Sequence, residues 1–144
     1  MEHADVIRLA KEAHSLEWRM TGNAGAGDRL AAAVTSRWQS SVLEKFPGRF
    51  VKEHRVGGLA ERIDLVDIVS GVAYELKVSP NNDHFEFYRD IFKVLVARDQ
   101  GLTQIAQFCF ICPVAAANRY ERGLRRSVLD MGARFGISLS VAAI

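Results

Sequence analysis

Apolar residues recur along the chain in two rhythms, which predict the order of the secondary-structure elements. Between residues 3 and 20 they return every three or four positions, as on one face of a helix. A second helical stripe runs from about residue 29 to 46 and ends at Pro47-Gly48. Three runs rich in β-branched residues then predict strands at 49–56, 62–69 and 72–78.

The second half of the chain alternates helices with strands. After the polar break at 79–83, a helix is predicted to about Asp99, with a core stripe of Phe85, Tyr88, Phe92 and Leu95. An apolar strand follows at 103–112, then one helix from Pro113 to about Met131, closed by Gly132, and a last strand at 137–144. Both faces of the predicted strands are apolar, so we expect an α/β fold with a central sheet flanked by helices on both faces.

The N-terminal stripe allows two interpretations. Its residues take the spacing of a coiled-coil seam: Val6, Leu9, Ala13, Leu16 and Met20. A helix packed on its own domain is the favoured interpretation, and a contact between two copies of the chain is the alternative. The glycine-containing loop at 21–27 follows no strand and precedes no Lys-Ser or Lys-Thr pair, which favours a connector over a phosphate-binding loop.

Composition narrows the class of protein. A chain of 144 residues favours one domain, and 49% hydrophobic with 25% charged residues is typical of globular proteins. The net charge of +2 permits a nucleic-acid partner without demanding one. The sequence contains no apolar run of the roughly 18 residues that a membrane span needs, and its N-terminus has no signal-peptide core. We therefore expect a cytoplasmic protein with no membrane partner.

Cys109 and Cys112 form a CxxC pattern within a predicted strand. Positions three apart on a strand point to opposite faces, so the two thiols should diverge. Neither the helix start of a redox motif nor two further zinc ligands are evident. The spacing therefore indicates buried structural cysteines.

Three polar side chains interrupt the apolar runs at 62–69 and 72–78. If Ser70-Gly71 forms a two-residue turn, Asp64 lies opposite Lys77, and Glu75 is the diagonal neighbour of Asp64. Because strand side chains alternate, all three project from one face, and Asp67 falls on the other. Two buried carboxylates and an ammonium are costly unless they serve each other or a ligand.

Asp64, eleven residues before Glu75-Leu76-Lys77, resembles the D…ExK signature of the PD-(D/E)XK nuclease superfamily, the restriction-endonuclease-like fold. The resemblance covers about residues 28–112 and implies an αβββαβ core with a mixed central sheet. The predicted N-terminal helix at 1–20 and the C-terminal helix and strand at 113–144 lie outside that core but within the same single domain. Ile63 stands where the signature carries a proline. The resemblance implies a Mg²⁺-dependent deoxyribonuclease, of endonuclease type as in restriction enzymes and junction resolvases.

The resemblance also implies roles for individual residues. Asp64, Glu75 and the carbonyl of Leu76 would hold Mg²⁺, with Mn²⁺ as a substitute, because hard cations prefer oxygen ligands. Lys77 would orient or deprotonate the attacking water. Glu44, on the helix before the strands, would support the metal through water or a second ion, with Glu17 as a weaker choice.

Basic side chains on the later helices are the candidates for DNA contact. They comprise Arg89, Lys93, Arg119, Arg122 and Arg126. Because a chain this small has little room for a recognition domain, the resemblance suggests a homodimer acting on DNA, or a module whose protein partner supplies recognition. A non-catalytic nucleic-acid-binding or assembly subunit with the same fold is the alternative, and a purely structural ion-pair cluster ranks last.

Overall fold

The computed structural model describes residues 2–21, 27–78, 83–102, 104–123 and 126–144. The predicted connector therefore lies mostly outside the described residues. Five helices and five strands alternate in the order α1 (Glu2–Thr21), α2 (Gly27–Lys45), β1 (Phe50–Arg55), β2 (Arg62–Asp67), β3 (Val72–Leu76), α3 (Asp83–Asp99), β4 (Gln107–Cys112), α4 (Val114–Gly123), α5 (Arg126–Arg134) and β5 (Ser138–Ala143).

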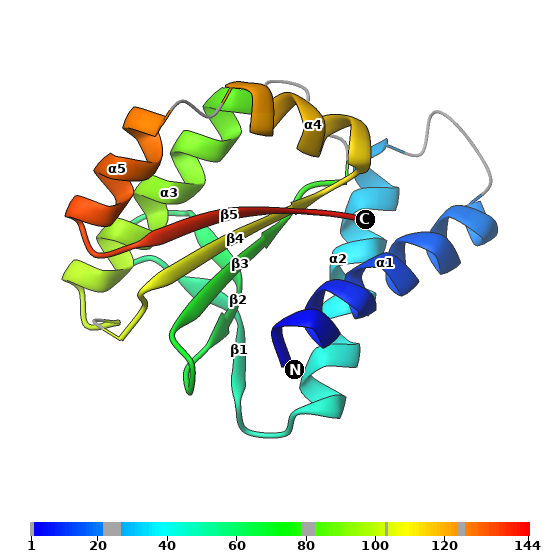
Figure 1. The fold of residues 1–144 in the computed structure, drawn as a ribbon. Coiled ribbons are helices and arrows are strands. Elements are labelled where there is room, and N and C mark those ends of the chain that lie inside the picture. The colour runs from blue at the N-terminus through cyan, green and yellow to red at the C-terminus, as the bar shows by residue number, and fades with distance from the viewer. Residues whose placement is uncertain (1, 22–26, 79–82, 103, 124–125) are drawn as a thin grey trace.

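The five strands form one mixed sheet in the order β1-β2-β3-β4-β5 (Figure 1). The first three strands are antiparallel neighbours, whereas β3, β4 and β5 run parallel. Helix α3 connects β3 to β4, while α4 and α5 connect β4 to β5, as parallel pairing requires. The predicted α/β class with a mixed sheet is confirmed.

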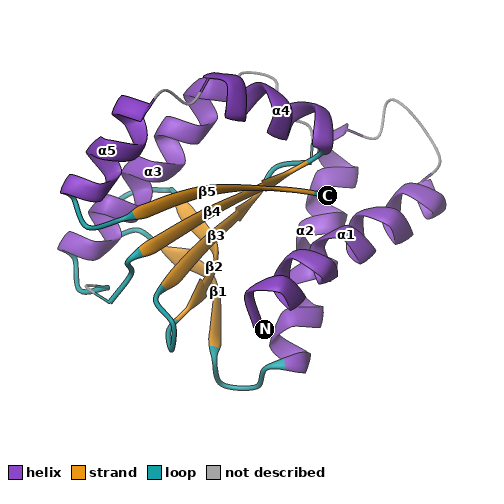
Figure 2. Cartoon of the chain, in the orientation of Figure 1, coloured by secondary structure: helices purple, strands orange, loops and turns teal. Residues whose placement is uncertain are grey.

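Helices cover both faces of the sheet (Figure 2). Helices α1 and α2 lie on one face, and their core residues pack against Leu65, Tyr74 and Leu76. Helices α3 and α4 pack on the other face, where Phe87 and Tyr120 meet Phe108 and Phe110. Two separate apolar clusters therefore enclose β3 and β4, which explains why these strands lack the alternation of a half-exposed sheet.

The turn between β2 and β3 is longer than predicted. Residues 68–71 form the connection, and Leu65 pairs with Tyr74 rather than with Leu76. The register is therefore shifted by two residues, so its continuation places Asp64 opposite Glu75 and not opposite Lys77. A shift of two preserves the side-chain face. Asp67 accounts for the longer turn, because its carboxylate accepts hydrogen bonds from the backbone N–H groups of Val69 and Ser70.

Of the four residues predicted as the core stripe of α3, Leu95 packs against the core, and the other three do not. Phe85, Tyr88 and Phe92 are 63%, 46% and 64% exposed. The sheet-facing side instead contains Phe87, Val94 and Ala97 together with the charged Asp90 and Lys93. Charged residues occupy the buried face because they bind one another and groups on the sheet, as described below.

The C-terminal segment also departs from the prediction. The single helix expected over 113–131 is two helices, α4 and α5, and Gly132 lies buried inside α5 instead of closing a helix. A Cβ at Gly132 would lie 3.0 Å from both the carbonyl oxygen of Ile137 and the side chain of Leu139. The absence of a side chain therefore lets α5 pack closely onto the start of β5.

The apolar stripe of α1 and the two cysteines were also interpreted from the sequence. On α1, Val6 and Ala13 are buried against α2, as the packed-helix interpretation predicts, whereas Leu16 and Met20 are exposed. Cys109 and Cys112 are free and buried in clusters on opposite faces of the sheet, as predicted. Among the described residues, no helix has the length and apolarity needed to cross a membrane.

Candidate functional site

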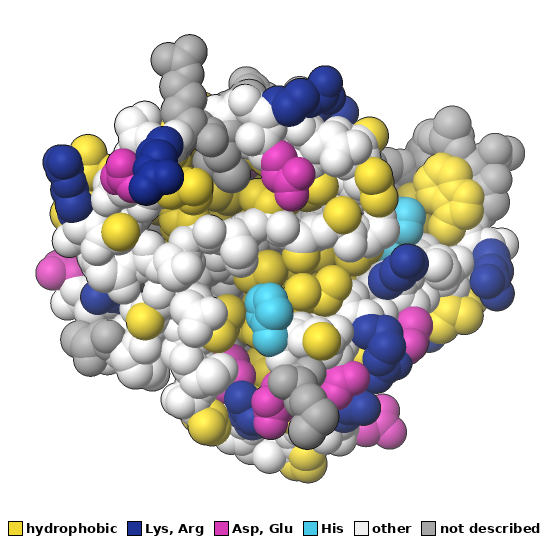
Figure 3. All heavy atoms as spheres, in the orientation of Figure 1, with side chains coloured by type: hydrophobic (Ala, Val, Ile, Leu, Met, Phe, Trp, Pro, Cys, Tyr) yellow, Lys and Arg dark blue, Asp and Glu magenta, His cyan; other side chains and the backbone are white. Residues whose placement is uncertain are grey.

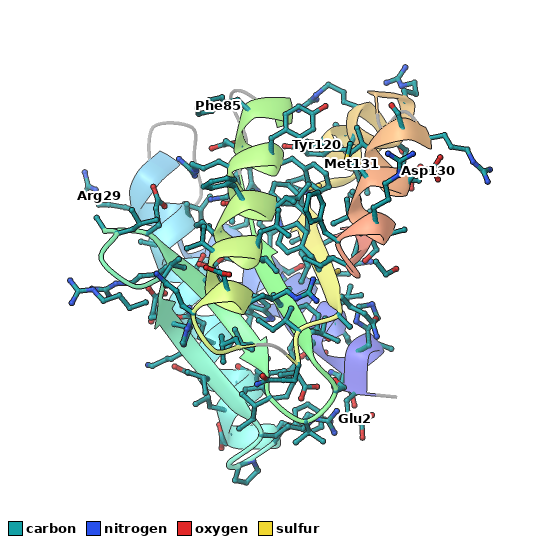
Figure 4. All side chains as sticks on the ribbon, turned by 90° about the vertical axis from the view of Figure 1, so that its left-hand side faces the viewer. Glu2, Arg29, Phe85, Tyr120, Asp130 and Met131 are labelled. Atoms are coloured by element: carbon teal, nitrogen blue, oxygen red, sulfur yellow. The ribbon has the colours of Figure 1, made fainter. Side chains whose placement is uncertain are left out.

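A polar cleft of about 720 Å³ opens between the N-terminal parts of α2 and α3, beside the end of β3. Side chains from both helices and three strand segments line it, among them Ser36, Gln39, Glu53, Asp64, Lys77 and Glu86. In Figure 4, α2 with Arg29 and α3 with Phe85 stand on the two sides of this region. Three residues of the D…ExK segment, Asp64, Leu76 and Lys77, border this cleft.

Asp64 reaches the cleft from β2. Its Oδ2 accepts a hydrogen bond of 2.9 Å from the backbone N–H of Leu76, which fixes the carboxylate against β3. Burial raises the pKa of Asp64 above its usual value, and the Leu76 N–H and the nearby ammonium groups offset that effect only in part. A cation bound near Asp64 would therefore be favoured, because it would stabilise the ionised carboxylate.

Glu75 lies behind the cleft in a buried ion-pair cluster. Its Oε1 is 2.7 Å from the ammonium nitrogen of Lys93, which also donates to the carbonyl oxygen of Arg62 at 2.7 Å. Lys93 Nζ lies 3.0 Å from Asp90 Oδ1 as well. Glu75, Asp90 and Lys93 are each at most 4% exposed, so α3 and the sheet exclude water from this cluster.

Lys77 links the buried cluster to the cleft. Its Nζ lies 3.9 Å from Glu75 Oε2 and 3.8 Å from Asp90 Oδ2, which is longer than a good hydrogen bond. The Lys77 side chain is 22% exposed. Its ammonium group can therefore turn toward a bound molecule at little cost, whereas that of Lys93 is held by three oxygens.

Electrostatics set Glu75 apart from an ordinary glutamate. Burial raises its pKa well above the usual value, and the negative charges of Asp64 and Asp90 raise it further, against the effect of the two lysines. Burial alone lowers the pKa of Lys93, but Glu75 and Asp90 reverse that effect and raise it. The cluster therefore contains three carboxyl groups, Asp64, Glu75 and Asp90, and two ammonium groups, so it can accept a further cation.

The strand that borders Asp64 is strained. Glu53 in β1 has a φ of 51°, which a non-glycine residue rarely adopts. It stands between the pairs Lys52–Leu65 and His54–Ile63, so it faces Asp64 across the ladder. Gln39 of α2 donates to both Glu53 Oε1 at 2.7 Å and the carbonyl oxygen of Asp64 at 2.9 Å. This one amide ties the strained residue and Asp64 to the helix that forms a wall of the cleft.

Some predicted site residues lie elsewhere. Glu44 is exposed near the C-terminal end of α2 and does not line the cleft, and Glu17 is bound to Arg37 at 2.6 Å. Lys93 belongs to the buried cluster and not to a DNA-accessible surface. Arg89 is partly exposed, with its Nε 3.8 Å from Asp90 Oδ1.

The remaining predicted DNA-contact residues lie on helices away from the cleft lining. Arg119 and Arg122 are exposed on α4, and Arg126 is exposed at the start of α5. Figure 3 shows Lys and Arg side chains near the upper margin of one face, where α4 runs. The structure brings Asp64, Glu75, Lys77 and Lys93 together, but it does not bring the arginines of α4 and α5 into that group.

The sequence did not lead us to assign a role in the site to four of its residues: Gln39, Glu53, Glu86 and Asp90. Asp90 carried a signal, because it precedes Lys93 by three positions and an i, i+3 charge pair lies on one helix face. Glu86 lines the cleft, and its Oε2 is buried without a hydrogen-bond partner among the described residues. Glu53 gave no sequence signal, since its importance depends on a backbone angle.

Comparison of the chain with protein-family models, with curated proteins and with solved structures finds no match. The chemistry of the cleft therefore has to be argued from its own residues.

Proposed function

We propose that the protein is a Mg²⁺-dependent deoxyribonuclease that hydrolyses phosphodiester bonds at this cleft. The observation that carries the proposal is the convergence of Asp64, Glu75 and Lys77 where the cleft meets the end of β3. Hydrolysis of a phosphodiester needs an oriented water, neutralisation of phosphate charge and help for the leaving oxygen. Carboxylates with an adjacent ammonium group suit those three tasks.

The proposal includes the restriction-endonuclease-like core. The order α2-β1-β2-β3-α3-β4 agrees with the αβββαβ arrangement that the D…ExK pattern implies, with Asp64 on the second strand and Glu75 on the third. Helix α3 then supplies Asp90 and Lys93 from behind the sheet. The agreement concerns order and placement, and it supports the assignment of residues from the signature.

The donor set fits Mg²⁺ bound through few protein ligands. The described residues contain no group of three or more His, Cys, Asp or Glu gathered as a metal site. Mg²⁺, however, commonly takes one or two carboxylates and keeps several waters. Asp64 and Glu75 each have a raised pKa because burial disfavours their charges, and Asp64 also raises the pKa of Glu75, so a cation between them is favoured. When bound, Mg²⁺ would supply an activated water and neutralise phosphate charge.

Metal binding, orientation of the water and binding of the phosphate would be performed by different residues of the chain. Asp64 and Glu75, with the carbonyl of Leu76, would hold the metal. Lys77, which is partly exposed at the cleft, would orient the water and bind a phosphate oxygen. Lys93 would favour the ionised form of Glu75 and align its carboxylate by contacting Oε1, whereas Lys77 lies nearer to Oε2. In this assignment Lys93 positions Glu75 and does not touch the substrate.

The test is incubation with linear, supercoiled, single-stranded and four-way-junction DNA, with Mg²⁺ or with EDTA. We expect cleavage that requires Mg²⁺ and falls on the order of 100-fold or more in Asp64→Asn and in Lys77→Met. Glu44→Gln is the matched control, because this carboxylate lies outside the cleft and should leave cleavage unchanged. Circular dichroism establishes that each variant is folded. Undiminished cleavage in Asp64→Asn or Lys77→Met would refute the proposed site.

One observation favours a second candidate, a DNA-binding or assembly subunit without catalysis. Glu75 is already paired with Lys93 at 2.7 Å, so the cluster can be satisfied without a metal. Calorimetric titration with Mg²⁺ separates the two functions, with Glu75→Gln as control. DNA binding together with neither Mg²⁺ binding nor cleavage of any of the four substrates would favour the second candidate.

A further inference from the structure

The two edges of the sheet differ in how they are protected. At one edge, β1 carries Lys52, Glu53 and Arg55, and the left-handed backbone of Glu53 interrupts its line. Charges and local distortions are the usual means by which an edge strand avoids pairing with another chain. The other edge, β5, reads Ser-Leu-Ser-Val-Ala-Ala and contains neither a charged residue nor a proline. Only β1 therefore carries the charges and the distortion that discourage pairing with another chain.

The free side of β5 presents hydrogen-bonding groups of the backbone. Ser138 N–H donates to the carbonyl of Ala106 at 2.9 Å, and Ile144 N–H donates to that of Cys112 at 3.0 Å. Because successive residues of a strand direct these groups to alternate sides, the even-numbered positions face β4. The N–H and C=O groups of Leu139, Val141 and Ala143 then face outward, where no strand of the described chain pairs with them.

The surface beside the outer edge of β5 is largely apolar. Figure 3 shows a band of backbone or uncharged polar atoms across the middle of the face along which β5 runs in Figure 1, with hydrophobic side chains above and below them. Most of the charged groups on this face lie nearer its margins. Beside the start of β5, a hollow of about 470 Å³ is bordered by Leu129, Ala133 and Leu139. Leu129 is 41% exposed. Apolar surface on both sides of this edge favours a partner strand that is itself flanked by apolar surface.

We propose that β5 is the interface with a second copy of this chain, through antiparallel pairing of the two β5 strands about a two-fold axis at Val141. A strand pairs with its own copy in an antiparallel, self-complementary way when a two-fold axis passes through its centre. Val141 of one copy then faces Val141 of the other, and Leu139 faces Ala143. Each such pair exchanges two backbone hydrogen bonds, and the result is one continuous ten-stranded sheet.

The size of the edge is sufficient for a dimer. The six residues of β5 span about 20 Å, and the sheet with a helical layer on each side is about 30 Å thick. Each copy therefore loses on the order of 600 Å² of surface, or about 1,200 Å² in total, which reaches the range of specific interfaces. A nucleic acid is the poorer occupant, because Ser138–Ile144 offers no cation to its phosphates.

Part of the alternative dimer contact on α1 is already buried within the chain. Val6, Ala10 and Ala13 already pack within the α1–α2 cluster, so the apolar stripe is mostly used inside the chain. The inference does not depend on the proposed nuclease activity, because it concerns a different part of the sheet and is tested by mass and cross-linking alone.

The experiment measures oligomeric state by sedimentation from low-micromolar to sub-millimolar concentration. We expect a dimer that becomes a monomer in Val141→Pro, since proline removes an outward N–H and not one that bonds β4. Val141→Ala is the matched control; it keeps the N–H and should remain dimeric. A monomeric parent protein, or a dimer unchanged by Val141→Pro, overturns the proposal.

Cross-linking keeps the proposal testable if Val141→Pro does not fold. Facing residues of a hydrogen-bonded antiparallel pair have Cα atoms about 5.5 Å apart, within disulfide range. Val141→Cys should therefore form a covalent dimer on oxidation. Leu139→Cys should not, because the two copies of that position would be on the order of 14 Å apart. The native Cys109 and Cys112 are buried and should not compete. A dimer in which Val141→Cys fails to cross-link overturns this interface.

Discussion

Lys77 and Lys93 contact the same two carboxylates but differ in environment. Lys93 is 4% exposed and within 3.0 Å of three oxygens, whereas Lys77 is partly exposed and no closer than 3.8 Å to either carboxylate. Removing one partner from a buried ion pair leaves an uncompensated charge, while an exposed partner is replaced by water. The two lysines should therefore have different effects on stability.

We expect Lys93→Met to lower the free energy of unfolding by about 3–5 kcal/mol, because Glu75 and Asp90 would remain buried without their closest cation. Denaturant unfolding followed by circular dichroism measures the change. Lys77→Met, with the same side chain introduced, is the control and should lower stability by at most about 1 kcal/mol. Equal losses in the two variants would contradict the distinction.

Asp67 should make the stability depend on pH. Burial raises its pKa, but hydrogen bonds from Arg49, Ser70 and Val69 outweigh burial and lower it below the ordinary value. A carboxylate with a lowered folded-state pKa stabilises the protein fully above its unfolded pKa of about 3.9, and that contribution is lost as pH falls through the folded pKa.

Asp67→Asn should therefore lower the unfolding free energy at pH 7 by about 1.5–3 kcal/mol, the usual contribution of hydrogen bonds to a charged group. The difference from the parent protein should shrink below about pH 4, as Asp67 of the parent protein becomes protonated. Urea unfolding at a series of pH values measures it. A difference that stays constant down to the acid limit would show that the Asp67 charge contributes nothing.

Strand β1 stores strain where it passes the cleft. The left-handed backbone of Glu53 costs a side chain with a Cβ about 1–2 kcal/mol, and glycine escapes that cost. Such strain persists where the surrounding structure enforces it, as the hydrogen bond from Gln39 does here. The hydrogen bond from α2 therefore holds Glu53 in a backbone conformation that destabilises β1.

Glu53→Gly should be more stable than Glu53→Ala by about 1 kcal/mol, although alanine is the better strand former in an extended backbone. Both variants remove the carboxylate and its bond to Gln39, so their difference isolates the backbone. Thermal and denaturant unfolding of the pair measure it. If alanine is the more stable of the two, the backbone at residue 53 is not left-handed in solution.

Periodicity predicted all five strands and their order along the chain, because apolar runs between turn residues are a local signal. The register of β2 and β3 was not predicted, because the length of the turn depends on the bonds of Asp67 and not on Ser70-Gly71. The buried face of α3 was not predicted either. An aromatic stripe and a charged stripe were both present, and only the partners on the sheet determine which one is buried.

At the scale of the whole molecule, the candidate site contains residues that the sequence predicted and others that only the folding of the chain brings to it. The spacing of Asp64, Glu75 and Lys77 predicted that the three lie close together, and the register shift of two still leaves Asp64 hydrogen-bonded to β3 at Leu76. Asp90 and Lys93 join them only because α3 crosses back over β2 and β3, and Gln39 joins only because α2 covers the other face. Apart from the i, i+3 spacing of Asp90 and Lys93, these long-range contacts have no local signature in the chain.

The buried Trp38 gives the protein an internal optical probe. Its indole N–H donates to the carbonyl oxygen of Val6 at 3.0 Å, and this hydrogen bond joins α2 to α1. Trp18, near the other end of α1, is 51% exposed. With Trp18 replaced by phenylalanine, the emission of Trp38 alone would shift to the red when α1 separates from α2. Separation of the N-terminal helix could thus be followed in real time, with no label attached.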